Sequence, residues 1–147
     1  MTIWTTRPDI HEMQRIHLNT AVERLGIEFV GVGDDWISAR MPVDGRTVQP
    51  MRILHGGASV LLAETIGSCA ASYCVDANKY VVGLDINANH VRAARSGWVL
   101  GVARPLHVGK STQVWEIRIA DEAEKLVCIV RLTMAVLTRE AQITGSP

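Results

Sequence analysis

The chain has few aromatic side chains and no excess of charge of either sign. Its 147 residues include one Phe, two Tyr and four Trp, and 15 basic residues balance 15 acidic ones. Proteins that bind single-stranded nucleic acid stack bases on clustered aromatic side chains, and a positive field gathers nucleic acids and anionic membranes. We therefore expect neither nucleic acid nor a membrane as a partner, although a small local basic site remains compatible with this composition.

Cysteine is scarce, and long apolar runs are missing. Cys69, Cys74 and Cys128 are an odd number and form no CxxC pair, which favours small core residues in a reducing compartment over a disulfide framework. Residues 1–8 lack the apolar segment of a signal peptide, and no apolar run reaches the ~18 residues that span a bilayer. We expect a cytoplasmic protein.

Common cofactor and metal motifs are also missing. His55, His90 and His107 lie far apart and have no HxH or HExxH spacing. The sequence contains no GxSxG elbow, phosphate-binding loop or GxGxxG. We expect no metal and no cofactor, while a Ser-His-Asp triad is neither indicated nor excluded.

The residues that are present indicate one globular domain, 1–147. Hydrophobic residues make up 48% of the chain and charged ones 20%, which is typical of a packed fold. Asp9 precedes Glu12 at the spacing of a capping box, so a helix is predicted over residues 9–25 with Gly26 as its end. This N-terminal helical segment covers residues 1–26, and residues 138–147 read as a flexible tail.

Most of the remaining chain has the period of β-strands. Runs at residues 27–32 and 36–41 flank a turn, and residues 42–55 read as a loop. Four further strands are predicted at 80–91, 98–103, 114–120 and 125–137. One face of the first of these four would carry Leu84, Ile86 and Ala88. One face of the last would carry Leu126, Cys128, Val130, Leu132, Met134 and Val136. Long strands after one apolar helix predict an α+β fold, with an antiparallel sheet around that helix.

That helix, predicted at residues 56–75, is apolar or small on every side and should be buried all round. Glu64 is its only charged residue. Burial disfavours a charged carboxylate and raises its pKa, which suits a general base or nucleophile. The plainer interpretation is that Glu64 bonds a backbone amide or pairs with an arginine.

Two neighbours support a catalytic interpretation. Ser68 lies one turn beyond Glu64 on the same face, and Gly56 stands at the helix N-terminus, where a free N–H can polarise a carbonyl oxygen. Each also fits a purely structural role, as a packing residue and a flexible cap. Eight residues of helix separate Gly56 from Glu64 by ~12 Å, so one chain cannot easily present both to one carbon. If both act on one substrate, two chains should share each site.

At these residues the sequence resembles the hotdog-fold acyl-CoA thioesterases. The branch is the one that contains phenylacetate and 1,4-dihydroxy-2-naphthoyl-CoA thioesterases and the proofreading thioesterase of enterobactin synthesis. The matching stretches, between residues 27 and 137, are MPVDGRTVQP, LHGGASVLLAETIGS, VVGLDINANHVR, GVARPLHVGK and RLTMAVL.

The resemblance implies a sheet wrapped around one long helix, in dimers that usually form homotetramers. It implies hydrolysis of an aromatic or medium-chain acyl-CoA thioester. Glu64 would attack the thioester carbonyl or activate water, and the Gly56 N–H would polarise the carbonyl. Gln49 and His55 would line the same pocket, and Ser68 would support the reacting group. Coenzyme A would be part of the substrate, with an acyl-carrier protein as the alternative carrier.

The same resemblance implies where coenzyme A lies. Gly83 would let the pantetheine chain pass close to a strand. Further contacts would come from two groups, His90, Val91, Arg92 and Ala93, and then His107, Val108, Gly109, Lys110, Ser111 and Thr112. Relatives often carry an aromatic residue and a glycine where this chain has Met51 and Arg52, so its acyl preference is open. A non-hydrolytic acyl-CoA or acyl-carrier-protein binding domain and a hotdog dehydratase are the alternative functions.

Overall fold

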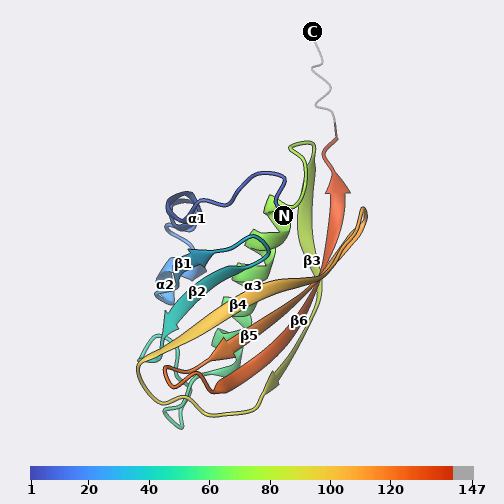
Figure 1. The fold of residues 1–147 in the computed structure, drawn as a ribbon. Helices are drawn as coiled ribbons and strands as arrows, with labels where there is room; N and C mark the ends of the chain where they lie inside the picture. The colour runs from blue at the N-terminus through green and yellow to red at the C-terminus, as the bar shows by residue number, and fades with distance from the viewer. Residues whose placement is uncertain (141–147) are drawn as a thin grey trace.

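The computed structural model describes residues 1–140 as one sheet folded around one long helix (Figure 1). Two short helices, α1 (Ile10–Ile16) and α2 (Ala21–Arg24), lead into strands β1 (Glu28–Val32) and β2 (Ile37–Pro42). The long helix α3 (Gly56–Tyr73) follows, and then strands β3 (Lys79–His90), β4 (Trp98–Val108), β5 (Thr112–Ala120) and β6 (Leu126–Thr138). All strand pairs are antiparallel, in the order β1-β2-β4-β5-β6-β3. This is the hotdog fold that the sequence predicts.

The N-terminal segment contains two helices where one was predicted over residues 9–25. The Asp9 side chain caps α1 as expected, accepting from the Glu12 N–H at 2.8 Å. The helix then stops, because Asn19 adopts a left-handed φ of 58° and the Thr20 side chain caps a new helix by accepting from the Val22 N–H. Gly26, with a φ of 72°, follows the end of α2.

Helix α3 packs its small residues tightly against the sheet. A Cβ added to Gly67 would lie 2.6 Å from Leu132 Cδ2, and one added to Gly101 would lie 2.7 Å from Ile66 Cδ1. The prediction that α3 is buried on every side is wrong for one side, where Glu64 is half-buried and Ser72 is exposed. The apolar composition of the helix could not reveal this open side, because most residues along it are also small or apolar.

A β-bulge changes which residues of β3 face the helix. The register of β3 against β6 shifts between Gly83 and Asp85, so Leu84 sits in the bulge and is 62% exposed. Ile86 and Ala88 pack against the core as predicted, but Leu84 does not join them. The bulge lets Gly83 face α3 together with Ile86.

The last strands follow their predicted alternation, with longer bounds. On β6, Cys128, Val130, Leu132 and Met134 are at most 1% exposed. Strand β4 continues past residue 103 to Val108, because a register shift after Pro105 accommodates the proline. The predicted gap between these strands, residues 104–113, is therefore shorter, and His107, Val108 and Thr112 belong to strands.

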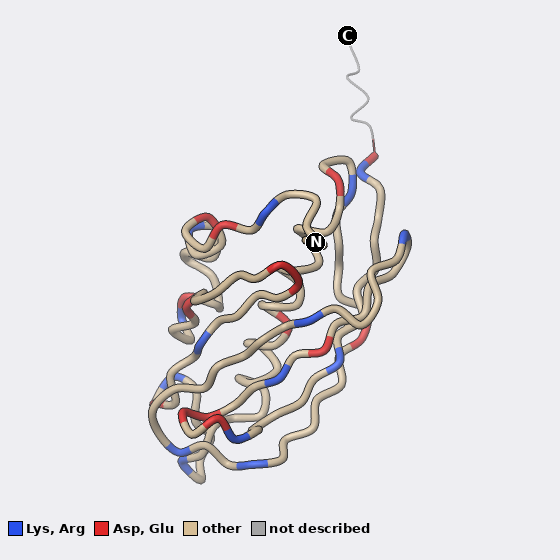
Figure 2. Tube along the Cα trace, in the orientation of Figure 1, with Lys and Arg blue, Asp and Glu red and all other residues tan. Residues whose placement is uncertain are grey.

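Four further expectations concern the cysteines, the charges, membrane-spanning helices and the C-terminal tail. Cys69, Cys74 and Cys128 are free thiols, the first and last of them buried. Charges of both signs are spread along the strands and turns (Figure 2). Over residues 1–140, no helix combines the length and apolar character needed to cross a bilayer. The tail predicted from residue 138 starts on the last residue of β6, and its residues 141–147 lie outside the described part.

Candidate active site

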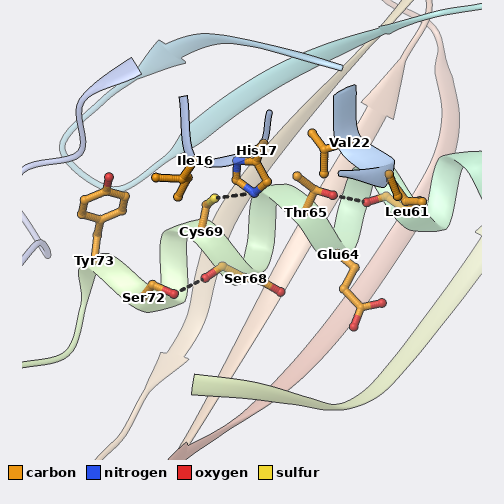
Figure 3. Close-up of a pocket in the computed structure, with 11 residues that line it drawn as sticks. Ile16, His17, Val22, Leu61, Glu64, Thr65, Ser68, Cys69, Ser72 and Tyr73 are labelled. Carbon is orange, nitrogen blue, oxygen red and sulfur yellow. Dashed lines mark hydrogen bonds between the residues drawn. The ribbon is translucent and has the colours of Figure 1, made fainter. Parts of the chain in front are cut away.

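A cavity of about 610 Å³ lies between the open side of α3 and the two N-terminal helices. Figure 3 shows the side chains that line it. Ile16, Ala21 and Val22 form one wall, and Leu61 contributes from α3. The walls are thus largely apolar, with a few polar groups, as in sites that bind small organic molecules.

Glu64 contributes the only carboxylate to this cavity. Within residues 1–140, no hydrogen bond or salt bridge engages that carboxylate, so the structural interpretation as an internal ion pair is not supported. Its Oε1 lies 2.8 Å from the position that a Cβ on Gly83 would occupy. Strand β3 therefore approaches the carboxylate closely because residue 83 has no side chain.

Ser68 is the one hydroxyl of α3 near Glu64 whose bonding capacity is largely unused. Thr65 Oγ1 donates to the Leu61 carbonyl at 2.7 Å, and Ser72 Oγ donates to the Ser68 carbonyl at 2.9 Å (Figure 3). The Ser68 hydroxyl has only the Met134 sulfur at 3.9 Å as a partner among the described residues. Since a thioether is a weak acceptor, the Ser68 hydroxyl is available to a bound molecule.

The N-terminus of α3 borders a second cavity, of about 420 Å³, which Gln49 and Gly56 line. His55 caps the helix, and its Nδ1 accepts from the Gly57 N–H at 2.8 Å. Because a backbone N–H can only donate, the neutral His55 ring carries its proton on Nε2, where it can donate to a carbonyl oxygen. Gln49 Oε1 accepts from the Met51 N–H, which leaves the Gln49 amide nitrogen free to donate.

The structure thus separates the predicted catalytic residues into two groups. Glu64 and Ser68 line the first cavity, whereas Gln49 and Gly56 line the second. His55 is exposed beside the second group. A single chain therefore does not bring Glu64 and the Gly56 N–H to one point, in agreement with the separation expected from helix geometry.

The residues assigned to coenzyme A are likewise divided. His90, Val91, Arg92 and Ala93 border the second cavity, and a Cβ on Gly56 would lie 2.9 Å from His90 Nε2.

The other coenzyme A group lies at the far end of the sheet. Val108, Gly109 and Lys110 border a hollow of about 300 Å³, and Ser111 is exposed beside it. Thr112 pairs with Ala135, which pairs with Val82. Because Val82 and His90 are eight strand residues apart, the two groups are separated by roughly 26 Å in one chain.

Sequence reasoning missed the residues that form the wall of the first cavity remote from Glu64. His17 and its neighbours come from the N-terminal segment, outside the stretches between residues 27 and 137 on which the family resemblance rests. Cys69 and Tyr73 also line the cavity, and their spacing from Thr65 at i+4 and i+8 was a usable signal. Burial raises the pKa of the Cys69 thiol to about 12, so this cysteine is a protonated wall residue and not a nucleophile.

The fold agrees with comparisons that define the class of protein. The family description "Thioesterase superfamily" matches residues 51–128. The chain belongs to this superfamily and is a thioester hydrolase.

Individual relatives cover nearly the whole chain. The 1,4-dihydroxy-2-naphthoyl-CoA hydrolase of Escherichia coli K12 is 50% identical over 135 residues, which are 92% of this chain and 99% of the relative. The proofreading thioesterase EntH of Cronobacter turicensis is 46% identical, over 92% of this chain and 98% of its own. The crystal structure of a Haemophilus influenzae thioesterase superposes with a TM-score of 0.93 at 48% identity, covering 97% of this chain and 99% of that one.

Proposed function

We propose that this thioesterase hydrolyses an aromatic or medium-chain acyl-CoA to the free acid and coenzyme A, with Glu64 as its catalytic carboxylate. The observation that carries the proposal is a carboxylate that no described residue engages, placed in a largely apolar cavity. Such a group has no structural partner to hold it, and its low-polarity surroundings favour reaction with a bound electrophile.

In the proposed reaction the thioester carbonyl oxygen accepts from the Gly56 N–H, where the positive end of the α3 dipole also acts. Glu64 then either takes a proton from water that adds to the carbonyl carbon, or attacks that carbon itself. In both routes the carbon–sulfur bond breaks and coenzyme A leaves as the thiolate, which in the first route takes the proton back from Glu64 and regenerates the carboxylate. In the second route water hydrolyses the resulting anhydride and regenerates Glu64. The Gln49 amide, His55 Nε2–H and the Ser68 hydroxyl are the further donors that hold the carbonyl and the water.

We propose that two chains form each site. Strand β3 is an edge strand of 12 residues, and Tyr80, Val82 and Leu84 on it are 38–62% exposed. An open edge of this length pairs readily with a second strand. Antiparallel pairing of two β3 strands about a two-fold axis near Ile86 would bring Gly83 of one chain beside His90 of the other.

This pairing would assemble the two residue groups. Within one chain, Gly83 approaches Glu64 and His90 approaches Gly56. Bringing Gly83 and His90 of different chains together therefore brings Glu64 of one chain towards Gly56 of the other. The same pairing would join the two distant coenzyme A groups. We further propose that such dimers form homotetramers, as the resemblance implies.

The names and structures of relatives support the same assignment. The E. coli relative is named for an aromatic acyl-CoA. A Staphylococcus aureus relative, 35–36% identical, was crystallised with a glutamate and, separately, with a glutamine replaced by alanine. Those two positions are 15 residues apart, which is the separation of Gln49 from Glu64 in this chain. We propose a cytoplasmic enzyme without metal or cofactor, and coenzyme A in preference to an acyl-carrier protein.

Replacing Glu64 by Gln tests the proposal. The change removes the base or nucleophile while keeping shape, so thiol release from benzoyl-CoA, followed with dithionitrobenzoate, should fall about a hundredfold to ten-thousandfold. Circular dichroism and the melting temperature should match those of the parent. Hydrolysis at the parent rate by Glu64→Gln would refute the mechanism. A parent protein that binds acyl-CoA without releasing thiol would instead favour the non-hydrolytic binding domain.

A further inference from the structure

His17 lies in the wall of the Glu64 cavity (Figure 3). Its contacts define which ring nitrogen donates a hydrogen bond and which accepts one. Its Nδ1 is 2.6 Å from the Met13 carbonyl oxygen, and its ring packs against Phe29 with centroids 5.3 Å apart. A carbonyl oxygen can only accept, so Nδ1 carries the proton. The neutral ring must then present Nε2 as an acceptor.

That acceptor has a weak partner. Among the described residues, only the Cys69 sulfur, at 3.9 Å, is placed to bond Nε2. Because burial raises the pKa of Cys69 to about 12, the thiol keeps its proton at neutral pH and donates it weakly towards the ring. A hydroxyl group from a ligand would donate a much stronger hydrogen bond to Nε2 than this thiol does.

His17 and Glu64 lie at opposite sides of the cavity. Cys69, which contacts His17, is five residues beyond Glu64, or about 7.5 Å along the axis of α3 and about 140° around it. In Figure 3 the Glu64 carboxylate points away from the side of α3 where His17 lies. Apolar side chains such as Leu61 and Val22 line the cavity as well. An acyl group whose carbonyl sits at Glu64 would therefore extend over apolar side chains towards His17.

We propose that His17 determines acyl specificity by accepting a hydrogen bond, through Nε2, from a hydroxyl at the end of the acyl group remote from the thioester. The inference rests on the proposed function and specifies which acyl groups the cavity binds most tightly. An acyl group without this hydroxyl forms no bond with Nε2. A carboxylate in the same place has no proton to give and meets the Nε2 lone pair, so it should bind worst.

Binding of non-hydrolysable thioethers tests this without relying on turnover. We would compare phenacyl-CoA with its 3-hydroxy, 4-hydroxy and 4-carboxy derivatives by titration calorimetry. The parent should bind the better hydroxy derivative about tenfold more tightly than phenacyl-CoA, the contribution of one hydrogen bond to a half-buried acceptor. His17→Phe should reduce this ratio to about one, because the ring keeps its volume but has no acceptor. His17→Gln should recover part of it through the amide oxygen.

His11→Phe is the matched control, because His11 is exposed on α1, the helix that His17 caps, and does not line the cavity. It should leave the ratio unchanged. A ratio near one in the parent, or a ratio that persists in His17→Phe, would overturn the inference. If His17→Phe does not fold, the ¹⁵N chemical shift of His17 Nε2 in the unaltered protein, measured by NMR, tests the inference instead. It should move on binding the hydroxy derivative and not on binding phenacyl-CoA.

Turnover of benzoyl-CoA, measured in parallel, separates this inference from the proposed function. Parent protein that hydrolyses benzoyl-CoA but shows no hydroxyl preference would refute the role of His17 and leave the proposed function intact. Parent protein that shows the preference but hydrolyses no thioester would support the role of His17 and refute the proposed function.

Discussion

Gly83 has no side chain at the point where β3 passes the Glu64 carboxylate. In Gly83→Ala the new Cβ would lie 2.8 Å from Glu64 Oε1. The flexible Glu64 side chain should yield to it and leave its position, so we expect kcat/KM to fall about tenfold to a hundredfold. The melting temperature should stay the same or rise slightly, because Ala suits a strand better than Gly. Thiol-release kinetics and thermal unfolding measure the two effects.

Gly45→Ala is the control for this change, since a Cβ on Gly45 meets nothing within 4 Å. It should alter neither activity nor melting temperature. Parent-like activity in Gly83→Ala would mean that the present position of the Glu64 carboxylate is unimportant for the reaction.

At single positions, the sequence indicates candidate residues but not their surroundings. Glu64 is a candidate because a lone charge stands out in an apolar helix, and Gly56 is one because glycine and a free N–H coincide at a helix start. Half-burial of Glu64 and its contact with Gly83 depend on a strand 19 residues further along the chain, which no local pattern encodes. The role of His55 as a helix cap through Nδ1 depends on its side-chain rotamer, which no local pattern encodes either.

Among the elements, α3 depends on a close approach to the sheet. A Cβ on Gly67 would lie 2.6 Å from Leu132 Cδ2 and 3.3 Å from Ile117 Cδ1, and both neighbours are fully buried. Gly67→Ala gains about 1 kcal/mol of helix propensity but overpacks the core at a cost of about 1–3 kcal/mol. We expect a net loss of up to about 2 kcal/mol in the free energy of unfolding, measured by urea denaturation.

Ser72→Ala, on the exposed side of the same helix, should change that free energy by less than about 0.5 kcal/mol. Stabilisation by Gly67→Ala would show that α3 can move away from β6 without loss of packing.

The difference between local sequence patterns and contacts with distant segments explains which elements were predictable. Helix α3 is a long run of small and apolar residues and strand β6 alternates regularly, so their bounds were expected within a few residues. The split between α1 and α2 was missed, because Asn19 and Thr20 interrupt a helical period only through backbone conformation and capping. The bulge at Leu84 was missed because alternation in sequence assumes an unbroken register, and the shift is set by pairing with β6.

At the scale of the whole molecule, a site built from two chains predicts an experimental result that a site within one chain does not. Glu64→Gln and Gln49→Ala should each be nearly inactive. In a mixed dimer, one of the two sites would combine Gln49 from the first variant with Glu64 from the second, and that site would be intact. Refolding the two variants together in equal amounts should form mixed dimers in half of the population. Activity should then return to about a quarter of the parent value.

Each variant refolded alone provides the baseline, and light scattering after size-exclusion chromatography reports the dimer. If Glu64 and Gln49 served a site within one chain, every site in the mixture would lack one of them and activity would stay at the baseline. Recovery requires chain exchange, so mixing the folded dimers without refolding should restore activity only as fast as the subunits dissociate. That time course would link the return of activity to the exchange of subunits, which a site built from two chains requires.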